Sequence, residues 1–201
     1  FPVKLDVVIA GVGGQGNVLA ARIIARAGME AGFSVRTAEV IGMAQREGAV
    51  VSHVRIGDAL RSPLIPGGEA ELLLAFEPAE AVRSLARLKG AGTAVVDPAP
   101  VVPVTVGLGL SAYDVDACLR FLKERVSRLF LLEASRLALA AGSPKAANAV
   151  FLGAVSALGI LPFAPEVLFR KLLDAVPDRF REVNRKAFFL GKEAAEAGGR
   201  R

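Results

Sequence analysis

Along the first 140 residues, apolar positions follow two different spacings in turn. The first run, Val7, Val8 and Ile9, is branched and continuous, which is typical of a buried strand. From Asn17, the sequence NVLAARIIARAGMEAG has helical spacing, with Arg22 and Arg26 on its polar side. Glycines separate the two runs. The pattern therefore predicts a strand, a glycine turn and a helix in that order.

The same alternation of short apolar runs with helical stretches continues to about residue 140. Further strands are expected at 33–38, 49–56, 72–76, 92–97, around 104–108 and at 129–132, and helices at 78–89, 115–125 and from about 133 to 141. After Gly142 the pattern is helical only, with helices expected at 146–158, 165–175 and 178–197, separated by Pro162, Pro165 and Pro177.

This order of elements predicts an α/β fold: a three-layer, Rossmann-like, mostly parallel or mixed sheet with a helical C-terminal portion. No repeat, linker or low-complexity segment interrupts the chain. We therefore expect residues 1–201 to form a single domain, with an α/β core over about 1–140 and a helical segment over about 144–197 packed on it.

The turn after the first strand reads GVGGQG, and it is the strongest chemical signal in the chain. Gly11, Gly13 and Gly16 satisfy the dinucleotide fingerprint G-x-G-x-x-G, and Glu39 follows the second strand where a ribose-binding acid would lie. Exposed amides at a helix start favour an anion. Gln15 adds an amide that could contact a bound group or a partner. A tight turn that needs glycines only for its backbone geometry explains the same residues.

Composition changes this picture in one respect, because the chain is unusually apolar. Hydrophobic residues make up 53% and mean hydropathy is +0.46, so either the core is large or another chain covers apolar surface. Residues 146–165 carry no charge, but Gly153, Gly159 and Pro162 interrupt the run. A buried or interface helix explains it better than a membrane span does. The first strand begins too early to leave room for a signal peptide, and we expect a cytoplasmic protein.

Few residues are available for metal or redox chemistry. Cys118 is the single cysteine and His53 the single histidine, so the chain alone holds no disulfide, iron–sulfur cluster or cysteine-based zinc site. His53 is either a hydrogen-bonded structural residue or a ligand contact. The net charge is +5, but the arginines are scattered and there is no Trp, which argues against a nucleic-acid surface.

Five motifs follow one another along nearly the whole chain: GVGGQG (11–16), AEVIGMAQREGAVVSHVRIG (38–57), SPLIPGGEAELLLAFEPAEAVR (62–83), KAANAVFLGA (145–154) and NRKAFFLG (184–191). Together, in this order, they resemble the beta subunit of indolepyruvate ferredoxin oxidoreductase. This family is related to the gamma subunits or domains of pyruvate and 2-oxoacid ferredoxin oxidoreductases.

The resemblance implies a non-redox subunit of a thiamine-dependent enzyme that oxidatively decarboxylates an aryl 2-oxoacid to an acyl-CoA and passes electrons to ferredoxin. Thiamine diphosphate and the iron–sulfur clusters are then expected in a large alpha subunit, with coenzyme A as co-substrate and ferredoxin reached through the complex. The isolated chain is expected to be inactive, and a homodimer of it is conceivable. One cysteine and the apolar excess agree with that division of labour.

The resemblance also carries over a set of binding residues. They are Gly11, Gly13, Gly14, Gln15, Gly16, Gly42, Met43, Gln45, Arg46, Ser52, His53, Arg55 and Glu77. Backbone amides of the first loop are expected to bind an anion, and Arg46 and Arg55 to supply charge-assisted hydrogen bonds. Two residues depart from the family's EVHGM and QRGG patterns, Ile41 and Glu47. They remove an imidazole and add a carboxylate beside Arg46.

Two other functions stay open. The first is a free-standing NAD(P)-dependent oxidoreductase that uses the glycine fingerprint and Glu39. The second is a structural interaction module in which the glycine loop contacts only a partner chain.

Overall fold

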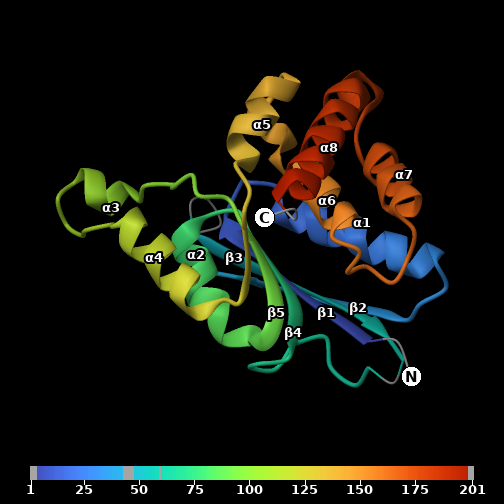
Figure 1. The fold of residues 1–201 in the computed structure, drawn as a ribbon, viewed down its shortest axis with the longest axis horizontal. Coiled ribbons are helices and arrows are strands. Elements are labelled where there is room, and N and C mark those ends of the chain that lie inside the picture. Colours follow the sequence, from blue (N-terminus) through green and yellow to red (C-terminus); the bar gives the residue numbers. More distant parts are fainter. Residues whose placement is uncertain (1–3, 43–47, 59, 199–201) are drawn as a thin grey trace.

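A computed structural model describes residues 4–42, 48–58 and 60–198. It confirms the α/β class: a six-stranded mixed sheet lies between two layers of helices (Figure 1). The strands are β1 (Lys4–Val12), β2 (Val35–Ile41), β3 (Ala49–Gly57), β4 (Ala70–Ala75), β5 (Leu88–Val96) and β6 (Arg128–Leu131). The helices are α1 (Asn17–Glu30), α2 (Pro78–Ser84), η1 (Leu85–Arg87), α3 (Val104–Gly107), α4 (Val115–Arg125), α5 (Ala134–Ala141), η2 (Pro144–Ala146), α6 (Ala147–Ala157), α7 (Pro165–Ala175) and α8 (Asp178–Gly198).

The strand order is β2-β3-β1-β4-β5-β6. Strands β1, β4, β5 and β6 are parallel, while β3 runs antiparallel to both β1 and β2. Every strand except β3 therefore ends at the same edge, which we call the carboxyl edge. The opposite end of the sheet is the amino edge. Loops after parallel strands gather at the carboxyl edge, where ligands of open α/β sheets bind.

The two faces of the sheet are buried under different helices. Alternate residues of β1 divide between them: Val7 and Ile9 face the layer of α1 and α5–α8, whereas Val8 and Ala10 face α2 and α4. Burial on both faces explains why the central strands read as continuous apolar runs. It also accounts for much of the high hydrophobic content.

The C-terminal helices pack very closely. A Cβ on Gly153 in α6 would lie 1.9 Å from the Phe188 carbonyl oxygen, and one on Gly191 in α8 would lie 2.0 Å from that of Val150. Glycine is required at both contacts because the backbones touch. The uncharged run at 146–165 contains α6, which is buried almost all round. None of the helices in the described ranges is long and apolar enough to cross a membrane.

The structure corrects three predicted elements. Residues 104–108 were expected to form a strand, but they contain the short helix α3. Valines favour strands, yet Pro98, Pro100 and Pro103 remove backbone donors, and none of the six described strands pairs with this segment. The helix expected at 78–89 ends earlier because β5 already begins at Leu88, and β2 extends to Ile41 instead of ending at residue 38.

Candidate functional site

The glycine loop joins β1 to α1 at the carboxyl edge. Gly14 and Gly16 have φ values of 98° and 87°, a left-handed conformation that side chains disfavour. Gly13 donates its N–H to the Gly48 carbonyl oxygen at 2.9 Å, which ties the loop to the start of β3. The backbone conformation of the loop therefore requires glycine at positions 14 and 16, and Gly14 is exposed to solvent.

Gln15 is held by its own chain. Its Oε1 accepts a hydrogen bond from the Val12 N–H at 2.7 Å, and its Nε2 donates to the Phe76 carbonyl oxygen at 2.9 Å. Gly11 makes room for this side chain, because a Cβ there would lie 2.9 Å from Gln15 Oε1. The amide expected to orient a ligand instead fastens the loop to the end of β4.

A pocket of about 250 Å³ opens beside this loop. Gly14 and Gln15 form one wall, Asp97 at the end of β5 forms another, and Lys145 in η2 stands exposed at its rim. The complete lining is Gly14, Gln15, Phe76, Asp97, Ser135, Pro144, Lys145 and Ala147. The pocket thus combines backbone of the glycine loop, a cation and a carboxylate at the edge where ligands bind in such sheets.

Asp97 is the buried polar group of this pocket. Its carboxylate accepts hydrogen bonds from the Ser135 N–H at 2.7 Å, the Ser135 hydroxyl at 2.6 Å and the Ala99 N–H at 3.1 Å. Burial raises the pKa of Asp97, and the hydrogen bonds from Ser135 offset part of that rise. Its oxygens face protein donors, so Asp97 shapes the pocket wall by fixing the start of α5.

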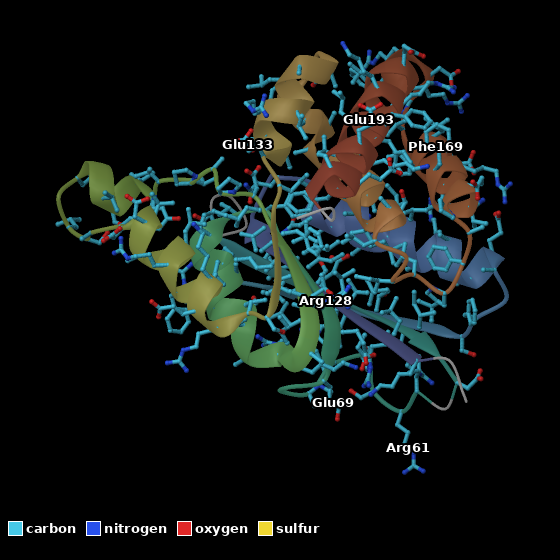
Figure 2. The ribbon with its side chains drawn as sticks, viewed as in Figure 1. Arg61, Glu69, Arg128, Glu133, Phe169 and Glu193 are labelled. Carbon is cyan, nitrogen blue, oxygen red and sulfur yellow. The ribbon has the colours of Figure 1, made fainter. Side chains whose placement is uncertain are left out.

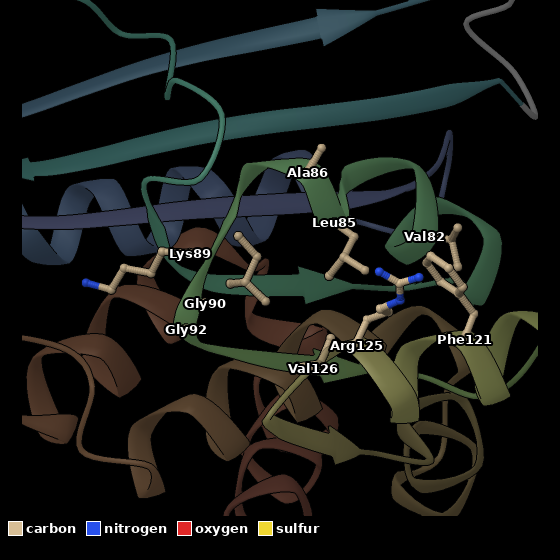
Figure 3. Close-up of a pocket in the computed structure, with 10 residues that line it drawn as sticks. Val82, Leu85, Ala86, Lys89, Gly90, Gly92, Phe121, Arg125 and Val126 are labelled. Atoms are coloured by element: carbon tan, nitrogen blue, oxygen red, sulfur yellow. The ribbon is translucent and has the colours of Figure 1, made fainter.

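Larger hollows lie elsewhere on the surface. The one in Figure 3, about 400 Å³, lies between α2 and η1, the start of β5 and α4, and Arg125 crosses the Phe121 ring within it. It is lined mainly by aliphatic side chains such as Leu85 and Leu88. Because it opens near the amino end of β5, it is separate from the carboxyl-edge pocket.

The second loop is only partly described. Gly42 follows β2 directly, but Met43, Gln45, Arg46 and Glu47 lie outside the described residues. Ile41 ends β2 and is exposed at the carboxyl edge. The predicted contribution of Arg46 to anion binding therefore stays a prediction.

Arg55, in contrast, lies at the wrong end of β3 for a ligand at the glycine loop. It pairs with Asp6 across the strands, whereas Gly11 pairs with Val50, five positions further along β1. At about 3.3 Å per residue, the separation is roughly 17 Å. Arg55 Nε and Nη2 contact the two carboxylate oxygens of Asp6 at 2.8 and 2.9 Å, and Nη1 donates to backbone carbonyls. The structure thus assigns Arg55 to a buried bidentate ion pair.

Ser52 and His53 are buried inside the sheet layers. His53 Nδ1 accepts a hydrogen bond from the Ile65 N–H at 3.2 Å, which fixes the loop that covers this face. Burial, with the positive charge of Arg87 and Arg55, lowers the pKa of His53. Among the described residues, neither His53 Nε2 nor Ser52 Oγ has a hydrogen-bond partner. Of the two interpretations of His53, the structural one fits this placement.

Glu77 does reach the carboxyl edge, directly after β4. Its Oε2 accepts from the Glu80 N–H at 2.9 Å and so caps α2, while its Oε1 accepts from the Tyr113 hydroxyl. Burial and this carboxylate together raise the pKa of Tyr113. Glu77 therefore joins β4, α2 and the segment before α4, and it is not among the residues lining the pocket.

The dinucleotide arrangement expected from Glu39 does not form. Strand β3 lies between β1 and β2, so Glu39 is separated from the glycine loop by a whole strand. Its carboxylate faces Arg22 of α1 at 3.5 Å. The ribose-binding acid of a dinucleotide fold lies on the strand next to the first one. The glycine fingerprint is therefore present, but Glu39 is not on the strand adjacent to β1, where a ribose-binding acid would lie.

The family model for pyruvate ferredoxin/flavodoxin oxidoreductase matches residues 6–194. The chain belongs to this family. Its curated relatives include chains named indolepyruvate oxidoreductase subunit IorB from Pyrococcus horikoshii (38% identical, covering 96% of both chains) and Archaeoglobus fulgidus (38% identical, covering 97% of both). These matches confirm the resemblance stated from the five motifs.

Solved structures give the same fold. The gamma subunit of a keto/oxoacid ferredoxin oxidoreductase from Geobacter sulfurreducens is 28% identical, with a TM-score of 0.69 over 96% of this chain and 99% of that chain. A 2-oxoglutarate:ferredoxin oxidoreductase from Magnetococcus marinus, solved with 2-oxoglutarate, coenzyme A and succinyl-CoA bound, has a TM-score of 0.72 at 23% identity. This chain matches 31% of that longer chain. The fold of the pyruvate ferredoxin/flavodoxin oxidoreductase family thus occurs both as a separate chain and within a longer one.

The redox groups of ferredoxin oxidoreductases do not fit the residues of this family member. An iron–sulfur cluster requires several thiolates, and Cys118 is the only cysteine. Burial and the nearby Glu77 raise the pKa of its thiol, which disfavours the thiolate that a metal needs. Among the described residues, no group of three or more His, Cys, Asp or Glu side chains could hold a metal ion.

Sequence reasoning missed Asp97, Ser135 and Lys145 as pocket residues. Both Asp97 and Lys145 could have been found from the sequence, because Asp97 ends a predicted strand and Lys145 is the first residue of the KAANAVFLGA motif. Nothing in the sequence pointed to Ser135, which lies at the pocket because Asp97 binds the first turn of α5.

Proposed function

We propose that the chain is the small, non-redox subunit of a thiamine-dependent indolepyruvate (aryl 2-oxoacid):ferredoxin oxidoreductase. The observation that carries the proposal is identity of 35–38% to IorB chains over nearly the whole length. The single, half-buried cysteine, Cys118, supports a division of labour in which the clusters and thiamine diphosphate belong to a large alpha subunit. The complex decarboxylates a 2-oxoacid, forms an acyl-CoA and reduces ferredoxin in the cytoplasm.

The part assigned to this chain is contact with coenzyme A at the carboxyl-edge pocket. Lys145 and the backbone of Gly14 favour an anionic group, and the glycine loop leads into the amino end of α1. A volume of about 250 Å³ suits one end of a large ligand rather than all of it. Arg46 of the second loop is expected to add a charge-assisted hydrogen bond.

Reconstitution tests the subunit role. The purified chain is mixed with the alpha subunit from the same organism, and acyl-CoA formation from indolepyruvate is followed with a viologen dye as electron acceptor. Neither subunit alone should turn over, and the mixture should. A mixture that stays inactive, or an alpha subunit that is fully active by itself, would refute the role.

Lys145→Ala tests the contact with coenzyme A. Loss of one charge-assisted contact to a phosphate is expected to raise the KM for coenzyme A by about tenfold or more and to leave the KM for the 2-oxoacid unchanged. Lys186→Ala, which removes an exposed lysine from α8, is the matched control. Equal KM values in the two variants would rule out the contact while leaving the subunit role intact.

A further inference from the structure

The segment between β5 and α4 carries the most exposed apolar side chains of the described chain. We call residues 98–113 the arm. Val102, Val104, Leu108 and Leu110 are 57%, 61%, 67% and 75% exposed, and none of the four belongs to either hydrophobic core. Figure 1 shows α3 and its flanking loops standing out from the rest of the molecule. Large apolar side chains exposed together on one short segment are typical of an interaction site.

The chemistry of the arm points to a permanent contact. Its sequence, PAPVVPVTVGLGLSAY, has no charged residue between Asp97 and Asp114. Transient electron-transfer contacts are small and polar, whereas permanent interfaces are large and apolar. An uncharged arm therefore suits a constitutive partner rather than a ferredoxin that must bind and leave.

Hydrogen bonds within the arm restrict its conformation. The Leu108 N–H donates to the Val104 carbonyl oxygen at 3.1 Å, and the Leu110 N–H donates to that of Thr105 at 2.8 Å. The Thr105 and Ser111 hydroxyls lie 2.8 Å apart and close the turn. Because these bonds restrict the arm in the isolated chain, less entropy is lost on docking and its apolar area contributes to affinity more fully.

Both ends of the arm are fixed beside the candidate site. Asp97, directly before the arm, lines the carboxyl-edge pocket and binds Ser135. Tyr113, its last residue, donates its hydroxyl to Glu77 at the end of β4. On the same edge, β2 ends with Val40 and Ile41 exposed. Because Asp97 lines the pocket and leads directly into the arm, a partner on the arm would border the pocket itself.

We propose that the arm docks into an uncharged apolar groove of the large alpha subunit and is the principal anchor of the complex. This rests on the proposed function, because it names the surface by which the small subunit joins its partner. Leu108 and Leu110 are the central anchors, since buried side chains at the centre of an interface carry most of its affinity. The carboxyl-edge pocket then lies at the junction of the two subunits.

The test compares Leu108→Asp/Leu110→Asp with Leu139→Asp, which places a carboxylate at an equally exposed leucine of α5, 61% accessible. Affinity of each full-length chain for the purified alpha subunit is measured by titration, and mass by sedimentation. The arm variant is expected to bind at least thirty-fold more weakly and the Leu139 variant within threefold of wild type. Both isolated chains should keep the wild-type unfolding midpoint, because the substituted side chains lie outside the cores.

Each outcome decides the proposal. Wild-type affinity in the arm variant, or an equal loss in the Leu139 variant, overturns the arm as anchor while the proposed function stands. A wild-type chain that fails to bind the alpha subunit overturns both. An isolated wild-type chain that is dimeric, and becomes monomeric in the arm variant, overturns the proposal in favour of a second copy as the occupant.

Discussion

At the amino edge of the sheet, Asp6 and Arg55 neutralise each other inside the protein, whereas at the carboxyl edge Asp97 and Lys145 border an open pocket. Figure 2 shows the two ends, with Glu69 near the first and Glu133, at the start of α5, near the second. Asp6 is inaccessible to solvent and the Arg55 guanidinium uses its remaining donor on backbone carbonyls. Charged residues occur at both ends, but the buried Asp6–Arg55 pair is closed to ligands, whereas Lys145 lines the pocket beside the glycine loop.

Residue type alone therefore does not locate a binding site in this fold. An arginine on a strand next to a glycine loop suggests an anion contact, yet the register of β3 places Arg55 five positions away. Because both charged groups of this ion pair are buried and bound to protein atoms, neither is available to a ligand. The amino edge should therefore respond to substitution through stability, and the carboxyl edge through binding.

The largest effect is expected for Asp6→Ala. Removal of one partner leaves the Arg55 guanidinium buried without its carboxylate, which costs about 3–5 kcal/mol of the free energy of unfolding. Urea denaturation of the isolated chain measures it. Arg136→Ala, which breaks the exposed pair with Glu133, should change stability by less than about 1 kcal/mol. Equal values for the two variants would mean that the amino edge is not the closed region described above.

The sequence predicts the local elements better than it predicts how the strands pair. Most strand and helix types follow from spacing, with α3 at 104–107 the exception, and the glycine loop, α1 and the C-terminal helices were predicted within a few residues. The antiparallel insertion of β3 between β1 and β2 could not be predicted, because pairing is set by contacts distant in sequence. That one topological fact separates Glu39 from the loop, and the register along β3 removes Arg55 from it.

An intermediate effect is expected for Gln15→Ala. The substitution leaves the Val12 N–H and the Phe76 carbonyl oxygen without partners, a loss of about 1–3 kcal/mol. Gln15→Glu separates the two roles of the side chain, because a carboxylate accepts from Val12 but cannot donate to Phe76. Denaturation should rank the glutamate variant between wild type and alanine. If both variants are as stable as wild type, the amide does not hold the loop.

A smaller, pH-dependent effect is expected from His53. Its pKa is lowered in the folded chain, so the unfolded chain binds the proton more readily. Stability is then fully present above pH 6.5, the ordinary pKa of histidine, and falls as pH drops toward the folded pKa. The facing charges are those of Arg55, Arg87 and Asp6. His53→Gln should flatten the stability profile between pH 7 and pH 5, and a profile as steep as wild type would assign the dependence to another group.

The smallest change in stability is expected for Lys145→Ala, so that any effect of this substitution on binding can be separated from an effect on folding. Lys145 is exposed at the pocket rim, so truncation should alter the free energy of unfolding by less than about 0.5 kcal/mol. The same substitution is predicted to weaken use of coenzyme A by about tenfold, a change that stability cannot explain. Asp6→Ala should show the reverse pattern. Its stability should fall strongly, whereas its KM for coenzyme A, measured without denaturant at a temperature at which the variant is folded, should be unchanged. If Lys145→Ala instead lowers stability as much as Gln15→Ala does, the pocket is a packing feature of the fold, and the carboxyl edge is no more open than the amino edge.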